Sequence, residues 1–267
     1  MSRVPQPIPR WDLQLSHSTV ADLTSSPYLW MVNICRHTCA FCQALTPAWR
    51  ALAHELRQEA HVANWDAELL GRPPTVLGEV NATPTIRAYV PRPNGSLRQV
   101  DYLGDRSKKD MLQFAYALMP SYVHVVDDEE AWQDLSSRAL DQRLPRLVLF
   151  VHRPAFASPP PILKAVSAKF REQALVLEVR VHPTVPGTAG FVRGLLPHAT
   201  FPTACLYSAD GAGHECLERA PSFARLSAAL EAHVAATTGE PSSESDGGSD
   251  RQEGAGSVGK DGHKEEL

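Results

Sequence analysis

The chain has 267 residues, a formal net charge of −4 and a hydrophobic share of 43%. This length indicates one or two domains, and five cysteines are too few for a disulfide-dense scaffold. Acids outnumber bases mainly after residue 238, so the rest of the chain is nearly neutral, which argues against a nucleic-acid partner. Because no apolar run reaches membrane-spanning length, we also expect no membrane span.

A short apolar run followed by an amphipathic helix organises the first half of the chain. Trp30–Cys35 is rich in strand-forming residues and predicts a buried strand. From Gln43 to Leu56 the apolar residues recur at helical spacing, which predicts a helix with one buried face. Cys39 and Cys42 therefore lie at the junction between the predicted strand and the predicted helix. The first thiol is at a helix N-terminus, where unpaired N–H groups favour a thiolate.

Two cysteines at this spacing indicate dithiol–disulfide chemistry, because Cys42 is near enough to attack a mixed disulfide formed at Cys39. Half of a zinc site has the same spacing. Such a site needs a second pair of ligands, and Cys205 and Cys216 are too far apart in sequence to form another Cys-x-x-Cys. Inert buried thiols are the remaining alternative. We expect no metal and no cofactor other than a redox-active disulfide.

The following elements continue the alternation of strands and helices. The sequence predicts a strand at His61–Asp66 and a closing helix at Lys108–Met119. Between them, Thr85–Val90 and Val100–Tyr102 are predicted to form a β-hairpin with Asn94-Gly95 at its turn.

Three blocks of this region resemble the protein disulfide isomerase branch of the thioredoxin superfamily. The resemblance implies a thioredoxin-like domain over residues 15–120 that would perform redox chemistry, and a first strand at Val20–Thr24. The blocks are Cys39-Ala40-Phe41-Cys42 with Pro47 and Trp49 after it, Asn81-Ala82-Thr83-Pro84-Thr85-Ile86, and Tyr102-Leu103-Gly104-Asp105-Arg106.

The resemblance also implies roles for individual residues. In the family the proline of the second block is cis, so the backbone of Thr83 is expected beside the cysteines, where a client peptide can pair with it as an added strand. An arginine at the position of Arg106 can approach the second cysteine and lower its pKa. The candidate catalytic residues are thus Cys39, Cys42 and Arg106, and the candidate substrate-binding residues are Thr83, Pro84 and Phe41.

Two departures from the family pattern bear on the chemistry. Ala40 and Phe41 stand where glycine and histidine are usual, so no imidazole lies between the cysteines. Asn33 stands where the family has a buried carboxylate that takes and gives the proton of the second thiol, and an amide cannot carry that proton near neutral pH. We therefore expect Cys39 to be less acidic than the first cysteine of family members with glycine and histidine between the cysteines. The Cys39–Cys42 couple should accordingly be less oxidising than theirs.

A second unit is predicted over residues 121–237. Strands are expected at Tyr122–Val126, Leu147–Val151, Leu175–Val181 and Phe201–Tyr207, and helices at Asp128–Leu140, Ile162–Phe170 and Ser222–Ala235. The alternation repeats that of the first unit, which indicates an α/β fold of two tandem thioredoxin-like domains, each a central mixed sheet flanked by helices. His152-Arg153-Pro154 replaces the Cys-x-x-Cys, so we expect this second domain to be redox-inactive.

The other cysteines have two interpretations each. Cys205 and Cys216 flank Asp210-Gly211, and a hairpin centred there places them directly opposite one another. They are either a structural disulfide or two free, semi-buried thiols. Cys35 is either a buried strand thiol or a third redox thiol.

The ends of the chain bear on its location. Residues 1–14 are a proline-rich, polar extension without the apolar core of a secretory signal. Residues 238–267 are expected to be a disordered, acidic tail. The tail ends in Lys264-Glu265-Glu266-Leu267, one carboxylate homologue away from an address for retention in the endoplasmic reticulum. We therefore expect a protein of the endoplasmic reticulum lumen, bound by a retrieval receptor through Lys264–Leu267, whose N-terminus is incomplete here.

Two classes of function follow. The first is a thiol–disulfide oxidoreductase that acts on cysteine-containing client proteins through its Cys-Ala-Phe-Cys site. The second is a thioredoxin-fold chaperone or adaptor that binds unfolded clients with little redox turnover. The two cysteines, Pro84 and Arg106 favour the first, whereas Asn33 and the missing histidine favour the second.

Overall fold

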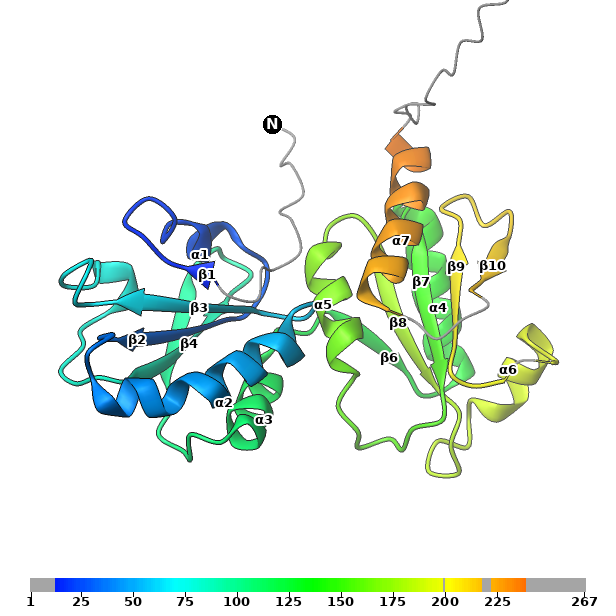
Figure 1. Ribbon diagram of the computed structural model, residues 1–267. Helices are drawn as coiled ribbons and strands as arrows, with labels where there is room; N and C mark the ends of the chain where they lie inside the picture. The colour runs from blue at the N-terminus through cyan, green and yellow to red at the C-terminus, as the bar shows by residue number, and fades with distance from the viewer. Residues whose placement is uncertain (1–12, 199, 218–221, 239–267) are drawn as a thin grey trace, which may run out of the picture.

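A computed structural model describes residues 13–198, 200–217 and 222–238. They form two domains side by side, each built on a five-stranded mixed sheet with helices packed against it (Figure 1). The predicted fold class is therefore confirmed. Thr238, the first residue of the expected disordered tail 238–267, is still helical. The rest of that tail, with the terminal Lys264–Leu267, lies outside the described residues.

The first domain has the strand order β1-β3-β2-β4-β5. Strands β1, β3 and β2 are mutually parallel, whereas β4 runs antiparallel to both β2 and β5. The elements are β1 (Leu13–Gln14), α1 (Asp22–Ser25), β2 (Trp30–Cys35), α2 (Ala40–Leu56), β3 (His61–Asp66), the 3-10 turn η1 (Thr75–Leu77), β4 (Thr85–Pro91), β5 (Leu97–Asp101) and α3 (Lys108–Leu118).

The first strand differs from the prediction. Val20–Thr24 is not a strand; the chain turns there and enters α1, because the backbone N–H of Val20 donates to the carbonyl of Ser16 at 3.0 Å. Val20 and Leu23 are both buried, and their separation of three residues is a helical spacing. The edge strand is instead Leu13–Gln14, which pairs with β3, so the predicted extension at residues 1–14 ends inside the sheet.

The alternation of side chains along β2 divides the core of the first domain. Trp30, Val32 and Ile34 pack on one face of the sheet with Trp65 and Tyr89. The opposite face is covered by α2 and α3, which pack against each other. The apolar stripe of α2 that the sequence predicts is buried there, through Leu45, Trp49, Leu52 and Leu56. The site-bearing helix is thus fixed along its whole length.

The second domain repeats the topology strand for strand, in the order β6-β8-β7-β9-β10. Cis proline bonds precede the equivalent strands β4 and β9, at Thr83–Pro84 and Phe201–Pro202. The sequence did not predict α6. The elements are β6 (Val123–Val126), α4 (Glu129–Asp141), β7 (Arg146–Val151), α5 (Pro161–Lys169), β8 (Leu175–Arg180), α6 (Ala189–Leu195), β9 (Thr203–Tyr207), β10 (His214–Cys216) and α7 (Phe223–Thr238).

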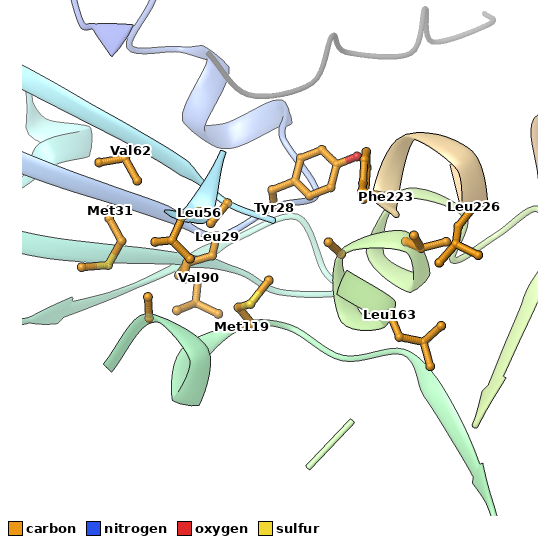
Figure 2. Packing of buried hydrophobic residues seen from close by; sticks show 14 of the residues in the cluster. Tyr28, Leu29, Met31, Leu56, Val62, Val90, Met119, Leu163, Phe223 and Leu226 are labelled. Carbon is orange, nitrogen blue, oxygen red and sulfur yellow. The ribbon is translucent and has the colours of Figure 1, made fainter. Parts of the chain in front are cut away.

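One apolar cluster runs from the first domain into the second (Figure 2). The rings of Tyr28 and Phe223 meet edge to face at 6.3 Å between centroids. Lys164, which is 7% exposed, donates to the backbone carbonyl of Tyr116 near the end of α3 at 3.3 Å. A cation at a helix C-terminus is favourable. The two domains therefore share buried contacts and not only a linker.

His61 makes the stability of the first domain depend on pH. Its ring stacks on Trp30 at 4.1 Å between centroids, and burial lowers its pKa to about 3. The folded protein therefore keeps this imidazole neutral, whereas the unfolded chain protonates it below pH 6.5. We expect this histidine to lower the free energy of unfolding by about 2 kcal/mol between pH 7 and pH 5.

Urea denaturation of the protein and of His61→Phe at the two pH values measures this contribution. The fall in the free energy of unfolding from pH 7 to pH 5 should be smaller by about 2 kcal/mol in His61→Phe than in the unaltered protein. The matched control is His54→Phe, at an exposed position of α2, which makes the same substitution without removing a buried ring. An equal loss in the protein and in His61→Phe would contradict the assignment.

Candidate functional site

The site lies where β2 ends and α2 begins. Cys35 is the last residue of β2, and Cys39 is the N-cap of α2 with an extended backbone (φ −75°, ψ 120°). The carbonyl of Cys39 accepts the first helical hydrogen bond, from Gln43 N–H at 3.0 Å. Cys42 is the third residue of the helix, where its side chain turns inward and is 5% exposed. One cysteine therefore faces the surface and the other faces the core.

The surroundings of Cys39 favour its thiolate. The pKa of Cys39 is lowered, chiefly by the backbone N–H of Cys42, against a smaller opposing effect of desolvation. The Thr83 side chain, the N–H of Phe41 and the charge of Arg36 lower the pKa further. Unpaired N–H groups at a helix N-terminus supply positive potential to a thiolate there. These surroundings are those that suit a thiol to act as a nucleophile.

The disulfide pairing differs from the expected one. Cys42 is bonded to Cys35, with 5.9 Å between their Cα atoms, and Cys39 is the free cysteine. The interpretation of Cys35 as an unpaired buried strand thiol is therefore wrong. The sequence spacing gave no reason to prefer this partner. The signal that was available is the number of cysteines: once Cys205 and Cys216 are paired, three remain in the first domain, so Cys42 has two possible partners.

An amide pair lies behind this disulfide. Asn33, 6% exposed on β2, donates to the side-chain carbonyl of Asn64 on β3 at 3.1 Å. The Oδ1 of Asn33 lies 3.1 Å from the sulfur of Cys35. The two asparagines meet without a charge, and neither amide can accept a proton near neutral pH.

Asn33→Asp is therefore expected to speed the resolution of a mixed disulfide by roughly a hundredfold, the low end of general acid–base catalysis. The new carboxylate can take the thiol proton, and the Asn64 amide can rotate to donate to it. Rapid-quench kinetics of client release at pH 7 measures the rate. Asn33→Ser, which removes the amide without adding a base, is the control. Equal rates for the two variants would contradict the proton-acceptor role.

A second wall of the site is formed by the segment before β4. The sulfur of Cys39 lies 3.8 Å from the carbonyl oxygen of Thr83, and the peptide bond from Thr83 to Pro84 is cis. Pro84 is buried and Thr83 half-buried. A groove of about 550 Å³ runs alongside, lined by Arg36 and by residues of the 71–83 segment. The backbone of Thr83 is thus next to the free thiol and next to an open groove.

The other candidate residues lie apart from the sulfur atoms. Phe41 is 70% exposed beside Cys39, on the surface side of the helix N-terminus. Arg106 is exposed in the connection between β5 and α3 and forms no hydrogen bond or ion pair with any residue that the structure describes. Its expected approach to Cys42 therefore stays a prediction, as does the client-binding role of Phe41.

A polar cluster that the sequence did not predict holds the segment before Cys39. His37 Nδ1 lies 2.9 Å from a carboxylate oxygen of Asp66, and Glu68 accepts from the backbone and the hydroxyl of Thr38 at 3.2 and 2.6 Å. Cys35 and Asp66 are partners in the parallel register of β2 and β3. Residues that follow neighbouring parallel strands meet at one sheet edge, and this was the available signal. The cluster positions the entry to α2.

The second domain has a buried ion pair on β8, close to the end of β7. Glu178 of β8 is fully buried, and the Nε of Arg180 lies 3.1 Å from its carboxylate. Arg153, which follows β7, lies 3.5 Å from the same carboxylate. At the far edge of this sheet Cys205 and Cys216 are opposite one another and bonded, 4.0 Å apart between Cα atoms.

Comparison with known proteins supports the assignment of the first domain. Residues 16–117 match the family model described as Thioredoxin. These residues form a thioredoxin domain. Protein disulfide-isomerase 2-3 of Arabidopsis thaliana is 32% identical over 110 residues, which are 38% of this chain and 24% of that protein. The protein disulfide-isomerase A6 homolog of Caenorhabditis elegans is 29% identical over 109 residues, 39% of this chain and 24% of that protein.

The chain thus spans about a quarter of the length of these curated relatives. Among solved structures, full-length ERdj5 shares 15% identity at a TM-score of 0.47, over 83% of this chain and 32% of that one. Zinc-bound human ERp44 shares 13% identity at a TM-score of 0.37, over 83% and 59% of the two chains. Within the described residues, we find no helix with the length and hydrophobicity needed to cross a membrane.

Proposed function

We propose that this chain is a thiol–disulfide oxidoreductase that acts on client proteins through its Cys-Ala-Phe-Cys site. The observation that carries the proposal is the pair of cysteines at the start of α2. Cys39 is accessible with a lowered pKa and lies 3.8 Å from the Thr83 backbone, while Cys42 is buried three residues on. A nucleophile with a resolving partner is what disulfide exchange needs.

The exchange proceeds in two steps when Cys39 and Cys42 are both reduced. The Cys39 thiolate attacks one sulfur of a client disulfide; a mixed disulfide forms, and the other client sulfur leaves as a thiolate that takes up a proton. Cys42 then loses its proton and attacks Cys39, which releases the second client thiol and leaves a Cys39–Cys42 disulfide. The reverse sequence oxidises a client dithiol. The extended Thr83 backbone beside the groove is suited to hold the client as an added strand.

The endoplasmic reticulum lumen is the proposed location. The sequence ends in Lys264-Glu265-Glu266-Leu267, which is close to a retention address read by a retrieval receptor. The disulfide between Cys205 and Cys216 fits an oxidising compartment. Deleting the last four residues from a chain targeted to the lumen should cause its secretion; unchanged retention would contradict the address.

A turnover assay tests the function. The full chain is mixed with a peptide that carries one disulfide, in glutathione buffers of different ratio, and the peptide is followed by mass spectrometry. We expect many peptides exchanged per chain, above the rate with glutathione alone. A rate equal to that of glutathione alone would remove the oxidoreductase proposal.

A binding module with little redox turnover is the second candidate. Phe41, 70% exposed beside Cys39, is the observation that favours it. On this account a variant with serine at positions 35, 39 and 42 would suppress aggregation of an unfolded client as well as the unaltered chain does. Phe41→Ser would then lose that suppression. If the triple serine variant loses the suppression of aggregation and Phe41→Ser keeps it, the binding-module account is wrong.

A further inference from the structure

We propose that Cys42 alternates between two partners, Cys35 and Cys39, and that the form bonded to Cys35 captures clients and holds them covalently instead of releasing them. This inference rests on the proposed function, because it needs Cys39 to exchange with client sulfur atoms. It adds a third cysteine to the site and a second activity, retention, to turnover.

The three sulfur-bearing residues surround the first turn of α2. Cys42 is bonded to Cys35, with the two Cα atoms 5.9 Å apart. Cys39 is three residues before Cys42, and the N–H of Cys42 is the main group that stabilises its thiolate. Cys42 is therefore within reach of a thiol on either side, one at the end of β2 and one at the helix N-cap. Only one of the two bonds can exist at a time.

The two forms interconvert without an outside oxidant or reductant. The Cys39 thiolate attacks the Cys42 sulfur; the Cys39–Cys42 bond forms and the Cys35–Cys42 bond breaks. Cys35 leaves as a thiolate and takes up one proton from water, so the number of disulfides is unchanged. The nearby groups suit this leaving thiol. The Oδ1 of Asn33, 3.1 Å from the Cys35 sulfur, can accept a hydrogen bond from the protonated thiol. A cavity of about 260 Å³ borders both Cys35 and Cys42 and provides space for water.

The position of the bond decides what happens to a client. With Cys35 and Cys42 bonded, the Cys39 thiolate can still attack a client disulfide; one client sulfur joins Cys39 and the other leaves as a thiolate. Cys42 then has no thiol with which to resolve the mixed disulfide, so the client stays attached until another thiol attacks. With all three thiols reduced, Cys42 resolves the same intermediate at once.

Disulfide mapping of the full chain tests the two-partner arrangement. The chain is equilibrated with oxidised and reduced glutathione, quenched in acid, alkylated with N-ethylmaleimide and digested with trypsin. Cleavage after Arg36 and Arg50 separates the cysteines favourably. Residues 11–36 contain Cys35 alone, and residues 37–50 contain both Cys39 and Cys42. A bond to Cys35 therefore joins two peptides, whereas a bond to Cys39 closes a loop within one.

We expect both the joined pair of peptides with the maleimide on Cys39 and the looped peptide with the maleimide on Cys35, because the two forms interconvert. The joined pair alone at every glutathione ratio would contradict the exchange of partners. The proposal is overturned if only the looped peptide appears at every glutathione ratio, with the maleimide on Cys35. It is equally overturned if neither bond forms. Because this map uses the unaltered chain, it does not depend on whether any variant folds.

A capture experiment tests retention, with Cys35→Ser as the matched variant. Both chains are first oxidised and then given a peptide whose single cysteine carries an activated disulfide. The oxidised Cys35→Ser chain has only the Cys39–Cys42 bond and no free site thiol. We therefore expect the oxidised unaltered chain to hold at least about tenfold more peptide than the oxidised variant. Equal capture by the two chains would contradict the proposal. Failure of the pre-reduced chains to take up and release peptide would instead contradict the proposed function, whatever the map shows.

Discussion

Cys39→Ser is expected to reduce disulfide exchange with a client peptide by at least roughly a thousandfold. Cys39 is the one cysteine left free, and its pKa is lowered by the Cys42 N–H at the helix N-terminus. A serine hydroxyl at the same place is neither ionised nor able to form a disulfide. Single-turnover exchange with a peptide disulfide, followed by mass spectrometry, measures the loss.

Cys42→Ser provides the contrast for this experiment. It leaves the nucleophile in place and removes the resolving thiol, so a mixed disulfide at Cys39 should accumulate to about one per chain while turnover stops. Alkylation of Cys39 in this variant should be half-maximal at a lower pH than that of an ordinary cysteine, because the pKa of Cys39 is lowered. Retention of exchange by Cys39→Ser would show that the site uses another nucleophile.

Arg180→Met is expected to lower the free energy of unfolding of the second domain by about 3–5 kcal/mol. Glu178 is fully buried, and Arg180 is its closest cation, with Nε 3.1 Å from the carboxylate. Arg180 also donates to the carbonyl of Ala157 at 2.6 Å, which holds the loop after β7. Removing it leaves a buried charge without its main partner. Chemical denaturation followed by circular dichroism measures the change.

Two further variants separate the ion pair from general packing. Arg153→Met removes a cation that is 3.5 Å from Glu178 but whose side chain is 32% exposed, so its effect should stay within about 1 kcal/mol. Adding Glu178→Gln to Arg180→Met should recover part of the loss, because the uncompensated charge is gone. A loss in Arg180→Met no larger than that in Arg153→Met would contradict the account.

The periodicity of apolar residues predicts most of the helices and strands. The apolar run at Trp30–Cys35 and the stripe from Leu45 to Leu56 each lie within one element, and such local patterns determine which face is buried. The predicted strand at Val20–Thr24 is wrong because Val20 and Leu23 are buried at a helical spacing of three residues. The contact of Tyr28 with Phe223 joins distant parts of the chain, and neither residue differs by pattern from an ordinary core position.

The sequence predicts the position of the cysteine site but not the disulfide partner of Cys42. The position of Cys39 and Cys42 at a strand–helix junction follows from the sequence. Which thiol bonds to Cys42 depends on how far the first turn of α2 folds back over the end of β2, and no local pattern encodes that distance. The cluster of His37, Asp66 and Glu68 depends likewise on the register of β2 against β3.

A redox titration of the three site thiols tests the central claim most directly. The full chain is equilibrated with glutathione buffers, trapped by alkylation, and the reduced fraction of peptides 11–36 and 37–50 is measured. We predict one reversible two-electron couple with a potential roughly between −270 and −180 mV, the range from thioredoxin to protein disulfide isomerase. Site cysteines that form no disulfide in any buffer, or a disulfide that no buffer reduces, would contradict the claim that this is a thiol–disulfide exchange site.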